Sequence, residues 1–338
     1  MEQEKQRPWR RWVVLVLMIA GFVLAGLFVP VRPEITVAPE RLSETPLFTL
    51  PQPFGPFYLV NTLPTLLITI LLLAVIAYST NRSLKKSEKT DLVPRGIGNL
   101  MEAFLELLYN LTEGSAGAKW AKTIFPWFAT IMIYVLFANL IKLIPGFESI
   151  GFLHPASGEG YAIRQLGGGW STLLATTVAE GGYIIVPFFR GISLDLNFTF
   201  ALAIISVVMI QVVGFRAQGF GYISKFFNVR TMFKTPFFGA MDFLVGLIEL
   251  FSEIMKVISF AFRLFFNMFA GIILVAVVAF LIGKITIISS MLYLFELFVG
   301  IIQAFVFGML TMVFMAMATQ GHGHEEEQVD ARSEVHEI

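Results

Sequence analysis

Six polar side chains share one face of a long apolar stretch near the middle of the second half of the chain. They are Asp242, Glu249, Glu253, Lys256, Arg263 and Asn267. At about 100° per residue, all six fall within roughly 80° of one another on a helix. At about 1.5 Å per residue the stripe is roughly 37 Å long, more than the hydrocarbon thickness of a bilayer. Ionisable groups inside a membrane are costly, so the stripe predicts an ion path. The alternative is a buried helix whose charges pair with neighbours and only hold a bundle together.

The composition is that of a membrane protein. Of the 338 residues, 56% are hydrophobic and only 14% are charged. The formal net charge is zero, which gives no reason to expect a nucleic-acid partner. The chain has no cysteine, which excludes disulfides, thiolate metal sites and thiol catalysis. We therefore expect an all-α polytopic membrane protein with lipid as its main surroundings.

Apolar runs predict about six membrane helices. Their approximate ranges are 13–31, 57–79, 124–144, 183 or 195 to 215, 236–282, and 285–319. The first run is either a signal peptide or a retained helix, and its length favours retention. An amphipathic segment at 97–113 predicts an interfacial helix. The run from 236 to 282 is too long for one perpendicular span, so it must tilt strongly, bend or project from the membrane.

These runs divide the chain into five parts. We expect an N-terminal anchor and external loop (1–56), membrane helices two and three with the interfacial helix (57–146), an external insertion (147–182), helices that carry the polar path (183–319, with the hairpin 238–319), and an acidic tail (320–338). Most of the 24 lysines and arginines fall in segments that face the same side of the membrane as the N-terminus. The positive-inside rule therefore places both termini in the cytoplasm.

We expect the last two helices to form an antiparallel hairpin that turns at residue 284. The residue numbers of two facing residues then add up to about 568. Arg263 then lies level with residue 305 and Glu296 with residue 272, and Gln303 comes within reach of Arg263 and Asn267. Topology separates the ionisable groups into two sets. Asp242, Glu249, Glu253 and Lys256 line the cytoplasmic half, whereas Glu296 and Asp195 line the outer half. An arginine does not lose its proton, so Arg263 cannot relay one and insulates the two halves.

A family resemblance rests on four motifs in order. RLFFNMFAG, Arg263 to Gly271, resembles the RLFGNM-AG signature of subunit a of F-type ATP synthases. Glu249 and Lys256 before the arginine, Gln303 and Glu296 on the last helix, DLNFT from Asp195, and FANLIKLIPG from Phe137 support it. The resemblance covers roughly residues 97–320.

The resemblance implies a role for each matched residue. Arg263 would be the essential stator arginine, with Asn267 and Gln303 in its polar surround. Glu296 and Asp195 would belong to the outer proton half-channel, and Glu249 to the cytoplasmic one. The last two helices would lie strongly tilted against the rotating c-ring. Two positions depart from the family: Ile272 stands where many members have Glu or His, and Phe266 replaces a glycine.

The same resemblance implies partner subunits and a location. These partners are the c-ring, b-type peripheral stalk subunits and the catalytic head, in a bacterial inner membrane. The chain has no GxxxxGK pattern, so ATP chemistry would occur in partners. No cofactor is expected, and His322 and His324 are interpreted as part of a solvated tail rather than a metal site. Two other functions stay open from the residues alone: an independent ion exchanger and a non-transporting scaffold.

Overall fold

The computed structural model describes most of the chain. The described residues are 36–43, 45–49, 51–52, 55–88, 96–144, 147–156, 158–224, 226, 236–282 and 286–320. The expected first span (13–31), the turn at 284 and nearly all of the tail lie outside them. The chain forms two compact units. The first unit comprises Met1–Thr65, Lys142–Gly191 and Asn267–Gly300, and the second comprises Leu66–Ile141, Ile192–Phe266 and Ile301–Ile338.

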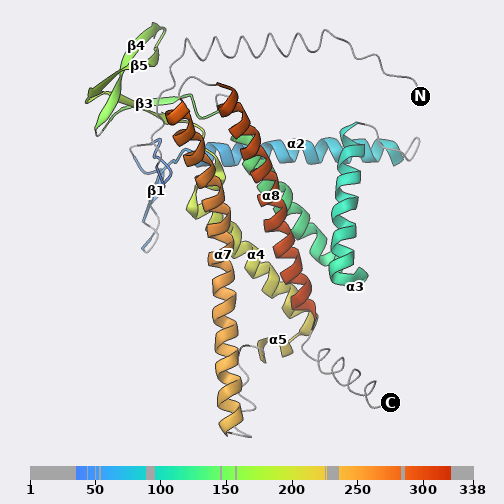
Figure 1. The fold of residues 1–338 in the computed structure, drawn as a ribbon. Coiled ribbons are helices and arrows are strands. Elements are labelled where there is room, and N and C mark those ends of the chain that lie inside the picture. The colour runs from blue at the N-terminus through green and yellow to red at the C-terminus, as the bar shows by residue number, and fades with distance from the viewer. Residues whose placement is uncertain are drawn as a thin grey trace. The chain divides into compact units, whose positions relative to one another are not determined.

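Helices dominate the described residues (Figure 1). The long ones are α2 (Thr62–Glu88), α3 (Ile97–Ile141), α4 (Leu196–Gln218), α7 (Pro236–Ile282) and α8 (Thr286–Thr319). All five are long and apolar enough to cross a membrane. This confirms the prediction of a largely helical, multi-pass membrane protein. The predicted sixth span is the 13–31 segment, which falls outside the described part.

Helix α3 joins two segments that the sequence analysis separates. Gly117 interrupts it with φ 73° and ψ 159°, a backbone conformation that glycine adopts without a steric penalty. The predicted interfacial helix at 97–113 lies before this break, and the predicted third span lies after it. Pro126 is accommodated inside the second part. The interfacial placement of the first part stays a prediction.

Helix α4 has a clear signal at each end. Asp195 is its N-cap, and its carboxylate accepts a hydrogen bond from the backbone N–H of Asn197 at 2.9 Å. Gly219 ends the helix with φ 63° and donates its N–H to the carbonyl of Phe215. Residues 183–187 form a strand, so the alternative start of the fourth span at 183 is wrong. Pro187 and the cap at Asp195 keep the helix from extending back to that point.

The second unit is held together by packing of α3, α4, α7 and α8. One buried cluster joins Val135, Leu202, Leu264 and Ala304, one residue from each helix. The rings of Phe260 and Phe307 lie 5.2 Å apart. The positions of Phe260 and Phe307 sum to 567, close to the 568 predicted for facing residues of the hairpin.

The first unit contains a sheet that the sequence analysis did not assign. Strands β3 (Gly151–Pro155), β4 (Glu159–Gly167), β5 (Trp170–Glu180) and β6 (Tyr183–Pro187) pair antiparallel in the order β3-β6-β4-β5 (Figure 1). Gly167, Gly168 and Gly169 all have positive φ and make the β4–β5 turn. The short strands β1 (Phe48–Thr49) and β2 (Pro56–Phe57) form a separate pair. The predicted insertion at 147–182 is thus largely folded as sheet.

Candidate functional site

Arg263 lies on α7 in the second unit and is partly exposed. Its guanidinium makes one weak contact within the helix, to the hydroxyl oxygen of Ser259 at 3.4 Å. Among the described residues, the ion pairs join Lys142 to Glu296 and Lys256 to Glu253, and neither includes Arg263. The described chain therefore offers this guanidinium no carboxylate, although a charge inside a membrane needs a counter-charge or water.

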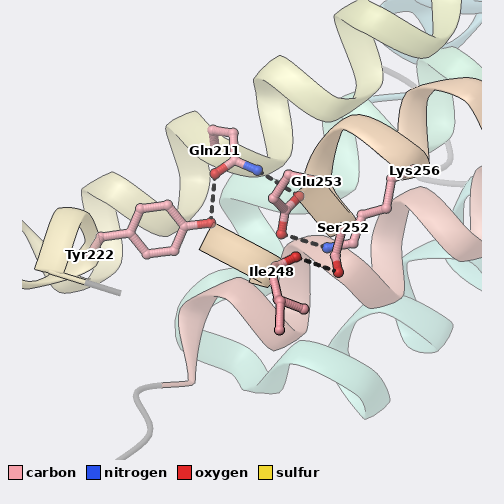
Figure 2. A network of polar contacts seen from close by, with 6 residues as sticks. All are labelled: Gln211, Tyr222, Ile248, Ser252, Glu253 and Lys256. Atoms are coloured by element: carbon pink, nitrogen blue, oxygen red, sulfur yellow. Dashed lines mark hydrogen bonds and ion pairs between the residues drawn. The ribbon is translucent and has the colours of Figure 1, made fainter. Parts of the chain in front are cut away.

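Glu253 is the centre of a polar network in the second unit (Figure 2). The residue is 7% exposed, and both carboxylate oxygens are engaged. Gln211 on α4 donates its side-chain N–H to one oxygen at 2.8 Å, and Lys256 donates to the other at 2.7 Å. The Lys256 ammonium also lies 4.7 Å from the centre of the Phe314 ring on α8. The network therefore ties α7 to α4 and leaves the carboxylate neutralised by its neighbour one turn away.

Tyr222 extends this network beyond α4. It lies in α5 (Gly221–Ser224), and its hydroxyl donates to the side-chain oxygen of Gln211 at 2.8 Å (Figure 2). Burial raises the pKa of Tyr222 to about 12, and the nearby charges of Glu253 and Glu249 act in the same direction. The phenol therefore keeps its proton at physiological pH and stays a donor. The ring fits because position 214 is glycine, where a Cβ would lie 2.6 Å from ring atoms.

Glu296 lies on α8 in the first unit and forms a buried ion pair. Its carboxylate accepts a hydrogen bond from the ammonium of Lys142 at 2.6 Å, and the two side chains are 7% and 3% exposed. On the α7 side its neighbour is Gly271, where a Cβ would lie 3.4 Å from a carboxylate oxygen of Glu296. This agrees with the predicted level of residue 272. The sequence alone indicated no protein partner for Glu296, and Lys142 is that partner.

A second acid lies near this pair. Glu148, in the segment after α3, accepts a hydrogen bond from the backbone N–H of Gly191 at 3.2 Å. The residue is exposed, yet partial burial of its carboxyl group raises its pKa. The positive charges of Lys142 and Arg190 oppose that rise, and the negative charge of Glu296 adds to it. Two cations and one further acid of the first unit thus act on the Glu148 carboxyl group.

The other predicted site residues are distributed over both units. Asp195 is 6% exposed and caps α4. Gln303 is buried in α8, Asn267 is exposed on α7, and Glu249 is partly buried. Asp242 lies within α7, but its side chain is outside the described part. Their roles in a proton path stay predictions.

Three residues that the sequence analysis did not place in the site take part in these contacts. Gln211 and Tyr222 support Glu253, and Lys142 supports Glu296. A single amide or lysine within an apolar run could have marked Gln211 and Lys142 as candidate site residues. Gln211 was missed because it points about 160° away from Asp195, off the polar face of α4 that carries Thr199 and Ser206. Tyr222 follows a chain reversal, and no helical periodicity links it to Gln211.

Asn139 and Ser193 make a further buried contact in the second unit. The Ser193 hydroxyl donates to the side-chain oxygen of Asn139 at 2.6 Å, joining α3 to the short 3-10 helix η1 (Ile192–Leu194). Within the described residues, no group of three or more His, Asp or Glu side chains gathers as a metal site would require.

Comparison with known proteins identifies the family. The family model described as ATP synthase A chain matches residues 63–316. A protein named ATP synthase subunit a from Campylobacter jejuni subsp. jejuni (strain 81-176) is 31% identical over 259 residues, covering 75% of this chain and 88% of that protein. A protein of the same name from Helicobacter pylori (strain Shi470) is 28% identical over 243 residues, covering 71% and 85%. The arginine-bearing helix, the buried acids and the five apolar helices thus occur in a chain that belongs to the ATP synthase A chain family.

Proposed function

We propose that this chain is the proton-translocating stator subunit of a rotary F-type ATP synthase, with Arg263 as the fixed charge that separates two proton half-channels. Protons would reach and leave carboxylates on a ring of c subunits, and ring rotation would couple this flow to ATP synthesis in a catalytic head. The chain would assemble with these subunits and with b-type stalk subunits. The bacterial relatives favour the inner membrane of a bacterium, and the distribution of basic residues favours cytoplasmic termini.

The observation that carries the proposal is the state of Arg263. A guanidinium on a membrane helix, paired with no carboxylate in the described chain, suits a carboxylate that arrives from outside the chain. Such a carboxylate would pair with Arg263 while ionised, and would leave for lipid only after taking up a proton. The permanent charge of the arginine would prevent protons from crossing directly between the two half-channels.

The surface beside Arg263 supports a protein partner. Met255, Phe262 and Phe266 follow one another on α7 at intervals of seven and four residues, so they share one face, and all three are exposed. Phe305 on α8 is exposed as well. Bulky apolar side chains beside a charged group would let a partner helix exclude water while its carboxylate reaches the guanidinium.

The two proposed half-channels would use the two buried acids described above. Glu253, with Glu249 and Lys256 nearby in the sequence, lies before Arg263 on α7 and would serve the cytoplasmic half. Glu296 on α8 and Asp195 at the start of α4 would serve the outer half, and Asn267 and Gln303 would hydrate the region of the arginine. Asp242 would lie at the cytoplasmic mouth.

Site-directed cross-linking tests the proposed partner surface. Because the chain contains no cysteine, a single Cys at Phe262 or Phe266 provides a unique attachment point. We expect both variants to cross-link to the c subunit in purified complexes, and Ile205→Cys, which is exposed on α4, to cross-link far less. Failure of the α7 variants to reach any c subunit, in complexes that contain one, would contradict the proposal.

A further inference from the structure

The ion pair between Lys142 and Glu296 is unusual in its degree of burial. Both side chains are more than nine-tenths buried, and the ammonium lies 2.6 Å from the carboxylate. Burial of two charges costs desolvation energy that their attraction often only balances, so such a pair is weak grounds for a purely stabilising role. The pair also joins residues 154 positions apart, from the end of α3 and from α8. It therefore fixes the position of one particular carboxylate.

A glycine on α7 lies beside that carboxylate. At Gly271 a Cβ would lie 3.4 Å from a carboxylate oxygen of Glu296, at the near limit of ordinary van der Waals contact. Gly271 is eight residues further along α7 than Arg263. Lys142 thus holds the acid of α8 against the helix that carries the proposed stator charge.

Glu148 brings a second acid under the influence of the same ammonium. It is exposed, whereas Glu296 is buried, and each acid interacts electrostatically with Lys142. The backbone N–H of Gly191 donates a hydrogen bond that fixes the Glu148 carboxylate, and Arg190 directly precedes Gly191 in the sequence. Arg190 itself is engaged with the side chain of Thr36 and the carbonyl of Ala38. Among the described residues, Tyr293 on α8 is a further titratable neighbour, and it interacts with both Glu148 and Glu296.

We propose that Glu148 is the acid that exchanges protons between the outer solution and Glu296, and that Lys142 is a positioning residue that serves as the shared counter-ion of the two acids. This inference deepens the proposed function and rests on it. A proton from water binds a carboxylate oxygen of Glu148, then passes through water to Glu296 as Glu148 becomes a carboxylate again. Lys142 keeps its own proton throughout and pairs with whichever acid is ionised. A carboxylate of the c-ring then takes the proton from Glu296, which becomes a carboxylate again.

The test is proton flow through the purified, assembled complex in liposomes. ATP synthesis and passive proton flux are driven by an imposed proton gradient and a potassium diffusion potential. We expect Lys142→Met to lower both by about tenfold or more, because it releases Glu296 from its position, and a correctly placed proton-transfer group contributes at least that much. Lys142→Arg should restore most of the flow, because a cation again faces the two acids. Glu148→Gln should lower the flow while leaving assembly normal, because Glu148 is exposed.

Matched controls separate these effects from general damage. Lys122→Met removes an exposed lysine of α3, and Glu180→Gln removes an exposed acid at the end of β5 in the first unit. Complexes with either control variant should show wild-type proton flux and ATP synthesis. Normal flow in Glu148→Gln, or a loss in Lys142→Met that Lys142→Arg does not relieve, would overturn the inference. Arg263→Ala in the same assay separates the proposed function from this further inference. Normal proton flow and ATP synthesis in Arg263→Ala would contradict the proposed function. Loss of both in Arg263→Ala, together with normal activity in the Lys142 and Glu148 variants, would refute only the further inference.

Discussion

Gln211 offers the clearest quantitative prediction, because it makes two hydrogen bonds in a partly buried network. Its amide N–H lies 2.8 Å from a carboxylate oxygen of Glu253, and its amide oxygen accepts from the Tyr222 hydroxyl, also at 2.8 Å. Gln211→Leu keeps a similar volume and removes both bonds. A hydrogen bond to a charged group contributes about 1.5–3 kcal/mol, and a neutral one about 0.5–1.5 kcal/mol. We expect a loss of about 2–4 kcal/mol in the free energy of unfolding.

Tyr222→Phe is the matched control. It keeps the ring packed against Gly214 and removes only the neutral bond, so we expect it to cost about 1 kcal/mol. In the double variant, Gln211→Leu has already removed the hydrogen bond that Tyr222→Phe would break. The loss in the free energy of unfolding of the double variant should therefore be smaller than the sum of the two single losses by about 1 kcal/mol. The assay is thermal or denaturant unfolding of the purified complex, followed by near-UV circular dichroism and by release of this subunit. Equal costs for the two single variants, or full additivity in the double, would refute the network.

Three further predictions concern neighbouring features. Tyr222 should remain a phenol at pH 11 when tyrosinate absorbance is titrated, because its pKa is raised to about 12. The stabilisation that this raised pKa gives is complete below about pH 10 and is lost as the pH rises through 12. Tyr222→Phe should remove this pH-dependent loss of stability. Gly214→Ala should destabilise the complex by about 1–3 kcal/mol because its Cβ would lie 2.6 Å from the Tyr222 ring, and Tyr222→Ala added to it should recover part of the loss in a thermal melt. Asp195→Ala should cost about 1 kcal/mol through loss of the α4 cap, whereas Asp195→Asn keeps the cap; if Asp195→Asn pumps protons normally, the residue is a cap and has no role in proton transfer.

The long helices were predictable because apolar runs and their interruptions are local features of a sequence. The helix from Pro236 to Ile282 follows from an unbroken run, and residue 195 was one of the two expected starts of the helix that became α4. The register of the last two helices followed from one turn position and a fixed rise per residue. The sheet at 151–187 was missed because its Gly, Ser and Thr content is equally typical of a loop.

The partners of the acidic residues were less predictable than the acids themselves. Glu253 and Glu296 were selected because a carboxylate in an apolar run is rare and costly. Gln211 and Lys142 meet these acids through tertiary contacts over 42 and 154 positions, which helical periodicity cannot reveal. Gly271 carries no chemical group, and its role as the neighbour of Glu296 follows only from the packing of α7 against α8 within the first unit.

The central claim is that Arg263 separates two proton half-channels, and ATP-driven proton pumping tests it most directly. Inverted vesicles carrying the assembled complex would be compared for wild type and Arg263→Ala, with passive proton leak measured in the same vesicles. The account predicts loss of pumping with normal assembly, together with an increased leak once the insulating charge is gone. Pumping at the wild-type rate by Arg263→Ala would contradict it and return the polar stripe of α7 to a structural role.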